Sequence, residues 1–216
     1  MSTESSSRPA AGAAASSGRI PKLVVVNLFG APGRGKSTVR AGMFWLMKTL
    51  GMSVEEISEY AKYLTLKNSL WQLKEEQLHV FSHQHHHQLL VERNGYRFAI
   101  TDSPLHLSAF YGSEHNYPGL QTLIDQAYAR FDNRNFFLTR AQASNAFETK
   151  GRAHDQAASE ALEPKMRRYL RERNLPFQEM AIDHLTPWRL LRAVAPEVDI
   201  PPHLQLPGWT DEPNAP

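Results

Sequence analysis

The stretch Gly30-Ala31-Pro32-Gly33-Arg34-Gly35-Lys36-Ser37-Thr38 has the spacing Gly-x-x-x-x-Gly-Lys-Ser that is typical of a phosphate-binding loop. Before it, the segment from Lys22 to Leu28 is rich in leucine and valine, which indicates a short buried parallel strand. After it, Ser37 to Leu50 has helical spacing of its apolar residues, and Gly51 follows as a helix-ending residue. A strand, a glycine-rich turn and a helix in this order are the context that such a loop requires.

Each part of the loop has a predicted role in binding ATP. The glycines allow backbone N–H groups to turn inward and surround phosphate oxygens, and the start of the helix adds further free N–H groups. Lys36 is expected to reach the β- and γ-phosphates, and the Ser37 hydroxyl is expected to ligate Mg²⁺. The alternative, a chance match to the pattern, does not explain the strand and helix on either side.

Further strand and helix patterns alternate along the chain. Alternating strands and helices predict an α/β fold, here a three-layer α/β/α arrangement around a five-stranded parallel sheet. The later strands are expected at 53–58, 97–101, 135–139 and 176–182, and the later helices at 68–92 (one helix or two), 120–129, 159–172 and 188–194.

Charged residues follow several of these strands, at the sheet edge where such folds bind ligands. Asp102 follows the third strand and is predicted to hold Mg²⁺, although an aspartate there could instead cap the next helix. Glu59 follows the second strand and is predicted to orient or deprotonate an attacking hydroxyl group. The alternative for Glu59 is a surface glutamate in the first turn of a helix.

Two arginines are candidates for stabilising charge during phosphoryl transfer. Arg140 ends the fourth strand, and Arg152 lies in the polar stretch that follows, so the region of about 140–157 is predicted to be a lid. A plain solvated loop is the alternative. Phe110 and Tyr111, after Asp102, are candidate substrate contacts, and core packing is their alternative role.

Five histidines gather in one polar helical segment. They are His79, His83, His85, His86 and His87. Imidazoles at this spacing could share a helix face and bind a metal, but no carboxylate lies in helical register to complete a ligand set. A solvated helix face is the alternative interpretation.

Composition limits the other possibilities. The 216 residues suit one domain, the absence of cysteine excludes disulfides, and a formal net charge of +2 does not by itself indicate a nucleic-acid-binding protein. The segment 1–19 is expected to be a disordered tail, 20–199 the domain and 200–216 a proline-rich tail. No apolar run is long enough to span a membrane, and a cytoplasmic location is expected.

Several segments together resemble a group of phage P-loop kinases that is related to the nicotinamide riboside kinases. The segments are 26–38, Glu59-Tyr60-Ala61-Lys62, Gln84, 100–105 and 136–140. The group includes enzymes that phosphorylate the hydroxymethyl group of 5-hydroxymethyluracil in phage DNA. The resemblance extends from about residue 22 to residue 182, and it implies a P-loop kinase-like fold with ATP and Mg²⁺ as cofactors.

The resemblance also implies roles for individual residues. Glu59 would be the base or hydroxyl ligand, Asp102 would serve Mg²⁺, and Gln84 would touch the substrate, while Arg140 and Arg152 match lid positions. The stretch 141–150 departs from the pattern of the group.

Three functions are therefore considered for the chain. The first is a kinase acting on 5-hydroxymethyluracil in phage DNA, located in the host cytoplasm. The second is a kinase of free nucleosides or nucleotides, and the third is an NTPase or switch that is not a kinase.

Overall fold

The computed structural model describes residues 22–112, 117–140 and 156–209. The predicted N-terminal tail (1–19), Arg152 with most of the predicted lid, and the end of the proline-rich segment lie outside these described residues. None of the described helices is long and apolar enough to cross a membrane.

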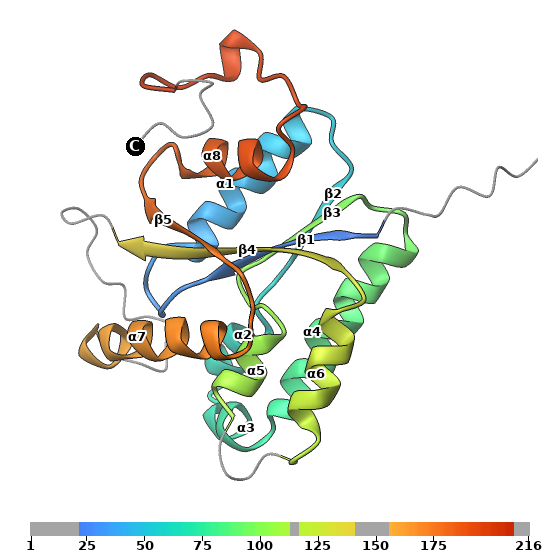
Figure 1. The fold of residues 1–216 in the computed structure, drawn as a ribbon, viewed down its shortest axis with the longest axis vertical. Helices are drawn as coiled ribbons and strands as arrows, with labels where there is room; N and C mark the ends of the chain where they lie inside the picture. The colour runs from blue at the N-terminus through green and yellow to red at the C-terminus, as the bar shows by residue number, and fades with distance from the viewer. Residues whose placement is uncertain (1–21, 113–116, 141–155, 210–216) are drawn as a thin grey trace, which may run out of the picture.

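The described strands form one parallel sheet, as the sequence predicts (Figure 1). Its five strands lie in the order β2-β3-β1-β4-β5, so the first strand is central. The strands are β1 (Val24–Phe29), β2 (Val54–Ile57), β3 (Phe98–Thr101), β4 (Asp132–Arg140) and β5 (Gln178–Ile182). Because β1 pairs with both β3 and β4, the phosphate loop that follows β1 leaves the sheet at its centre.

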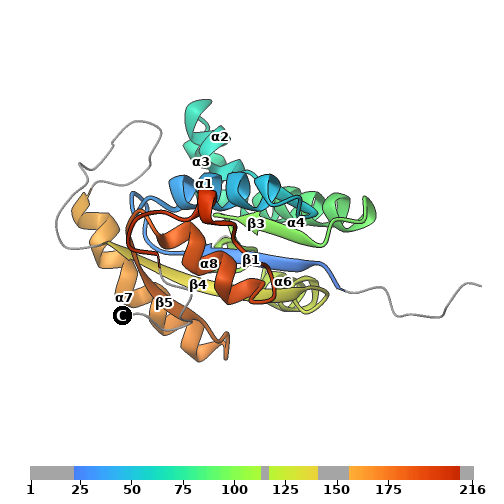
Figure 2. The same cartoon turned by 90° about the horizontal axis from the view of Figure 1, so that it is seen from above.

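Helices cover both faces of the sheet, which confirms the predicted three-layer fold. On one face α1 (Lys36–Thr49) and α8 (Thr186–Val194) lie side by side, as Figure 2 shows from above. The other face carries the remaining helices. They are α2 (Tyr60–Leu66), α3 (Leu70–Glu75), α4 (Gln77–Arg93), α5 (His106–Phe110), α6 (Leu120–Tyr128) and α7 (Gln156–Glu172).

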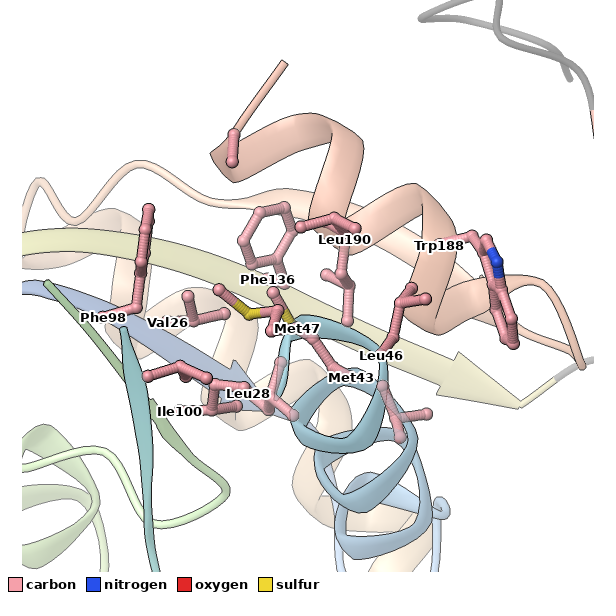
Figure 3. Packing of buried hydrophobic residues seen from close by; sticks show 14 of the residues in the cluster. Val26, Leu28, Met43, Leu46, Met47, Phe98, Ile100, Phe136, Trp188 and Leu190 are labelled. Atoms are coloured by element: carbon pink, nitrogen blue, oxygen red, sulfur yellow. The ribbon is translucent and has the colours of Figure 1, made fainter. Parts of the chain in front are cut away.

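The alternating side chains of β1 explain the two layers. Val26 and Leu28 point into the cluster with α1 and α8, while Val25 and Phe29 belong to clusters on the opposite face. The buried residues of α1 recur at helical spacing and so form a single stripe against the sheet. Figure 3 shows Met43, Leu46 and Met47 of this stripe packed among the strand residues.

The structure also differs from the sequence-based expectations in detail. The short helices α2 and α5 were not predicted, because neither has enough residues to show a helical pattern. The predicted helical segment 68–92 divides at Glu76 into α3 and α4. In the proline-rich segment, a 3₁₀ helix spans Pro202–Leu204, and Ile200 is buried against the α1–α8 face.

Candidate active site

The backbone of the phosphate loop adopts conformations that favour glycine. Gly30 has a φ of 140° and Gly35 a φ of 83°, both in the region that L side chains rarely adopt. A Cβ atom on Gly30 would also lie only 2.6 Å from the carbonyl oxygen of Leu138 on β4. The glycine at position 30 is therefore needed for both its dihedral angles and its close packing on the neighbouring strand.

Lys36 begins α1 and its side chain lies along the loop. Its Nζ donates to the carbonyl oxygens of Gly30, at 2.8 Å, and Ala31, at 3.1 Å. This holds the ammonium group on the inner side of the loop, beside the first N–H groups of the helix. A cation and free helix N–H groups at one place form an anion site, as the motif predicts.

Asp102 lies at the end of β3 and is 1% exposed. The Ser37 hydroxyl donates to its Oδ2 at 2.6 Å, so the two predicted metal ligands are in direct contact. The guanidinium of Arg40, one turn along α1, donates to the other oxygen, Oδ1, at 2.9 Å. A hydroxyl and a carboxylate beside a phosphate site are the hard oxygen ligands that Mg²⁺ prefers, so the residues fit this ion.

Glu59 stands between β2 and α2 and is half-buried, at the N-cap position of the helix. Burial raises the pKa of its carboxyl group above the ordinary value, and the nearby Asp102 raises it further. The positive charge of Lys36 lowers this pKa, but by less than burial raises it. A carboxyl group with a raised pKa is suited to accept a proton from a hydroxyl group.

A cavity of about 480 Å³ joins these residues to the short helices on the same side. The loop and the strand ends form one wall of it, and α2 to α5 form the rest. Its lining on the helical side is mixed, with apolar side chains, two lysines and a buried amide. These residues are Ala61, Lys62, Thr65, Leu70, Leu73, Lys74, Gln77, Val80, Leu107, Ser108 and Tyr111. The volume is in the range of pockets that bind small molecules or a single nucleoside.

Most of the predicted loop residues meet at this cavity. Pro32, Gly33, Gly35, Lys36, Ser37 and Thr38 line it together with Glu59 and Asp102. Arg34 instead makes an ion pair with Glu163 on α7, and Ala31 is fully buried. Arg140 ends β4, and its side chain lies outside the described part of the structure.

Besides Glu59, three residues were predicted to contact the substrate, and of these only Tyr111 lines the cavity. Burial together with Glu59 raises the pKa of its hydroxyl. Phe110 packs beside Tyr169 and the Phe29 cluster. Gln84 is buried in α4 and donates to the carbonyl oxygen of Ser58 at 3.0 Å, so it braces the chain next to Glu59.

Gln77 is a candidate that sequence reasoning missed. It begins α4, lines the cavity and is only 4% exposed, and its amide nitrogen donates to the carbonyl oxygen of Leu73. The sequence carries no motif around it. Its place depends on the break between α3 and α4, which periodicity alone does not locate.

A second feature that sequence reasoning missed is a group of hydrogen-bonded side chains between α5, α6 and α7. His106 is 1% exposed, and its Nδ1 lies 3.1 Å from the hydroxyl of Tyr169 on α7. The Tyr169 hydroxyl in turn donates to Gln121 on α6. Burial lowers the pKa of His106 to about 4, so the ring is neutral near pH 7. These contacts link three helices and position Leu107, Ser108 and Tyr111 at the cavity.

The histidine segment forms an aromatic contact with α2. His83 stacks on Tyr60 with ring centroids 3.7 Å apart, and His79 lies 2.9 Å from the Tyr60 hydroxyl. In the described part of the chain, no three histidine or acidic side chains are grouped so as to hold a metal ion. The cluster packs α2 against α4 and so supports the position of Glu59.

Comparisons with known proteins find structural neighbours but no sequence relative. No family model matches the chain, and no curated protein matches it. The structure of deoxyadenosine kinase from M. mycoides with bound dATP gives a TM-score of 0.43 at 18% identity, covering 74% of this chain and 90% of that one. The crystal structure of APE1195 gives a TM-score of 0.38 at 17% identity, covering 72% of this chain and 74% of that one.

Proposed function

We propose that this protein is an ATP-dependent kinase that transfers the γ-phosphoryl group to a hydroxyl group of an acceptor bound in the cavity. The observation that carries the proposal is the place of Glu59. It lines the same cavity as Lys36, Ser37 and Asp102 on one side and the mixed wall of α2 to α5 on the other. A site that only bound a nucleotide would not need the half-buried carboxyl group of Glu59 between its phosphate loop and the wall of α2 to α5.

The residues divide the reaction between them. The loop from Gly30 to Thr38 and Lys36 would hold the phosphates of ATP, and Lys36 would stabilise negative charge as the γ-phosphoryl group moves. Ser37 and Asp102 would hold Mg²⁺, which supplies charge neutralisation at the phosphates. Glu59 would accept the proton of the acceptor hydroxyl, whose oxygen forms a bond to phosphorus as the bond to ADP breaks.

For the acceptor, we propose the hydroxymethyl group of 5-hydroxymethyluracil in phage DNA. Support comes from the sequence resemblance, because three of its segments contribute residues to the cavity lining. These are the phosphate loop, the segment 59–62 through Glu59, Ala61 and Lys62, and the segment 100–105 through Asp102 and Ser103. A base within a duplex is out of reach, so the target base would be flipped out or single-stranded. The cavity is large enough for one base and its sugar.

A free nucleoside or nucleotide is the second candidate acceptor. The observation that favours it is the modest size of the cavity together with a formal net charge of only +2. Neither feature demands a long polyanion as partner. The catalytic roles of Lys36, Glu59 and Asp102 are the same for both acceptors.

One assay separates the candidates. The protein is incubated with γ-labelled ATP and Mg²⁺ and with three acceptors: DNA containing 5-hydroxymethyluracil, a panel of nucleosides and nucleotides, or buffer alone. Label in the DNA supports the proposed acceptor, and label only in free nucleosides or nucleotides would replace it with the second candidate. Release of phosphate with no labelled acceptor would identify an NTPase instead.

A further inference from the structure

Arg40 connects three parts of the site without lining the cavity. It lies on α1, three residues after Ser37 and four after Lys36, so it is a neighbour of each of them on the helix surface. Its side chain is 14% exposed and points away from solvent toward the ends of β2 and β3. No sequence motif drew attention to it.

The partners of Arg40 belong to both neighbouring strands. Its Nη1 donates to Asp102 Oδ1 at 2.9 Å, and the same atom lies 3.5 Å from the carbonyl oxygen of Ile57. Its Nε forms an ion pair of 3.3 Å with Glu56 of β2. One guanidinium therefore ties the end of β3, where Asp102 lies, to the end of β2, two residues before Glu59.

These contacts control the orientation of the Asp102 carboxylate. Ser37 donates to Oδ2 and Arg40 to Oδ1, so two donors one helical turn apart hold the plane of the carboxylate. Burial of a carboxylate to this extent costs free energy unless it is paired with a cation and hydrogen-bonded, and Arg40 supplies both. Arginine supplies both a permanent charge and a planar set of donors, which lysine does not.

We infer that Arg40 is a positioning residue for phosphoryl transfer. It fixes the carboxylate of Asp102 so that Oδ2 and the Ser37 hydroxyl face the phosphate loop as a pair of Mg²⁺ ligands, and it keeps the ends of β2 and β3 in register. The inference rests on the proposed function, but it concerns how the metal ligands are held and not which acceptor is used.

The substitution Arg40→Lys tests this inference because it keeps the charge and removes the guanidinium geometry. The readout is ATP affinity, measured with a fluorescent ATP analogue with and without Mg²⁺, together with kcat and the acceptor KM. Loss of a residue that orients a metal ligand typically costs about 10–100-fold in metal affinity or activity. In Arg40→Lys, we expect kcat to fall by about that factor, and so should the increase in ATP affinity that Mg²⁺ produces. The metal-free ATP affinity and the acceptor KM should stay near wild type.

Two further variants control the experiment. Arg134→Lys alters an exposed ion pair with Asp132 and is expected to change neither readout. Arg40→Gln also removes the charge, and its thermal unfolding midpoint shows how much Arg40 contributes to folding. If Arg40→Lys unfolds at a lower temperature but retains the wild-type response to Mg²⁺ and the wild-type kcat, Arg40 is only structural and the inference is wrong.

The experiment also separates this inference from the proposed function. If the wild-type protein binds Mg·ATP but phosphorylates no acceptor, the kinase proposal fails, and the Mg²⁺ response of Arg40→Lys still decides the role of Arg40. If wild-type ATP affinity does not respond to Mg²⁺ at all, the inference is overturned directly.

Discussion

The phosphate loop and the acceptor side of the cavity meet at Glu59, but their side chains are held in different ways. On the loop side, Lys36, Ser37 and Asp102 are tied to one another or to backbone carbonyls, and Asp102 is almost fully buried. On the acceptor side, the wall comes from the short helices α2, α3 and α5 and from the first turn of α4, and Leu70, which lines the cavity, is 39% exposed. A hydrogen-bonded donor site therefore faces a wall built mostly from short helices.

This difference predicts different effects of substitution in the two regions. Changes on the loop side should reduce the rate of transfer or the stability of the fold, because each side chain there is part of a connected group. Changes on the acceptor side should mainly alter KM for the acceptor.

The largest effect is expected at Lys36. Replacement by methionine removes the cation that stabilises the transferring phosphoryl group, and the transfer rate should fall by about 1,000-fold or more. Lys62→Met is the matched control, because Lys62 lines the cavity from α2 and not from the loop. The ATP affinity of the Lys62→Met variant should stay near wild type. A Lys36→Met protein that retained a tenth of the wild-type rate would contradict the donor role of Lys36.

The substitution Gly30→Ala should destabilise the fold, because its Cβ would meet the Leu138 carbonyl oxygen at 2.6 Å and its φ is 140°. Strain of this kind costs about 2–3 kcal/mol, measured as the free energy of unfolding in urea. Gly119→Ala is the control, since Gly119 has an ordinary φ and an added Cβ would have no neighbour within 4 Å among the described residues. Equal stability of the two variants would show that the loop is not packed on β4 as described.

On the acceptor side, Gln77→Leu should weaken acceptor binding while leaving ATP binding intact. It replaces a buried amide in the cavity wall with an apolar group of similar size, and loss of one hydrogen bond to an acceptor is worth about 1–1.5 kcal/mol, or roughly 10-fold in KM. Steady-state kinetics with varied acceptor measures this. If kcat falls and KM does not change, Gln77 acts on the transition state and the division between the two regions is too simple.

The smallest effect is expected on the stability of the fold, which is lowered when the buried carboxyl group of Glu59 is charged. Its pKa is raised in the folded protein by burial, so between the ordinary pKa and the raised one the folded state holds a proton that the unfolded state has lost. Stability therefore decreases as pH rises through this interval. Glu59→Gln should remove this loss of stability with rising pH. At pH 7 the variant should therefore unfold at a slightly higher temperature than the wild type, whereas below pH 4 the two proteins should unfold at the same temperature. Identical pH dependence of the two proteins would show that Glu59 is not buried as described.

The same contrast explains how far the sequence could predict the structure. The five strands, the loop and the places of Glu59 and Asp102 follow from contiguous patterns, and the sheet brings the strand ends together without further information. Gln77 and Arg40 could not be identified, because their roles depend on a helix break at Glu76 and on contacts with strands that lie far away in the sequence. Arg34 fits the motif, yet its side chain is turned to Glu163 by an ion pair that spans 129 residues.

The most direct test of the central claim, that Glu59 joins an ATP site to an acceptor site, is single-turnover transfer from bound γ-labelled ATP in the wild-type protein and in Glu59→Gln. ATP binding is measured on the same samples. The account predicts equal ATP occupancy and a transfer rate at least about 100-fold lower in Glu59→Gln, because the general base is lost. Transfer at the wild-type rate in Glu59→Gln, or no transfer to any hydroxyl by the wild-type protein, would contradict it.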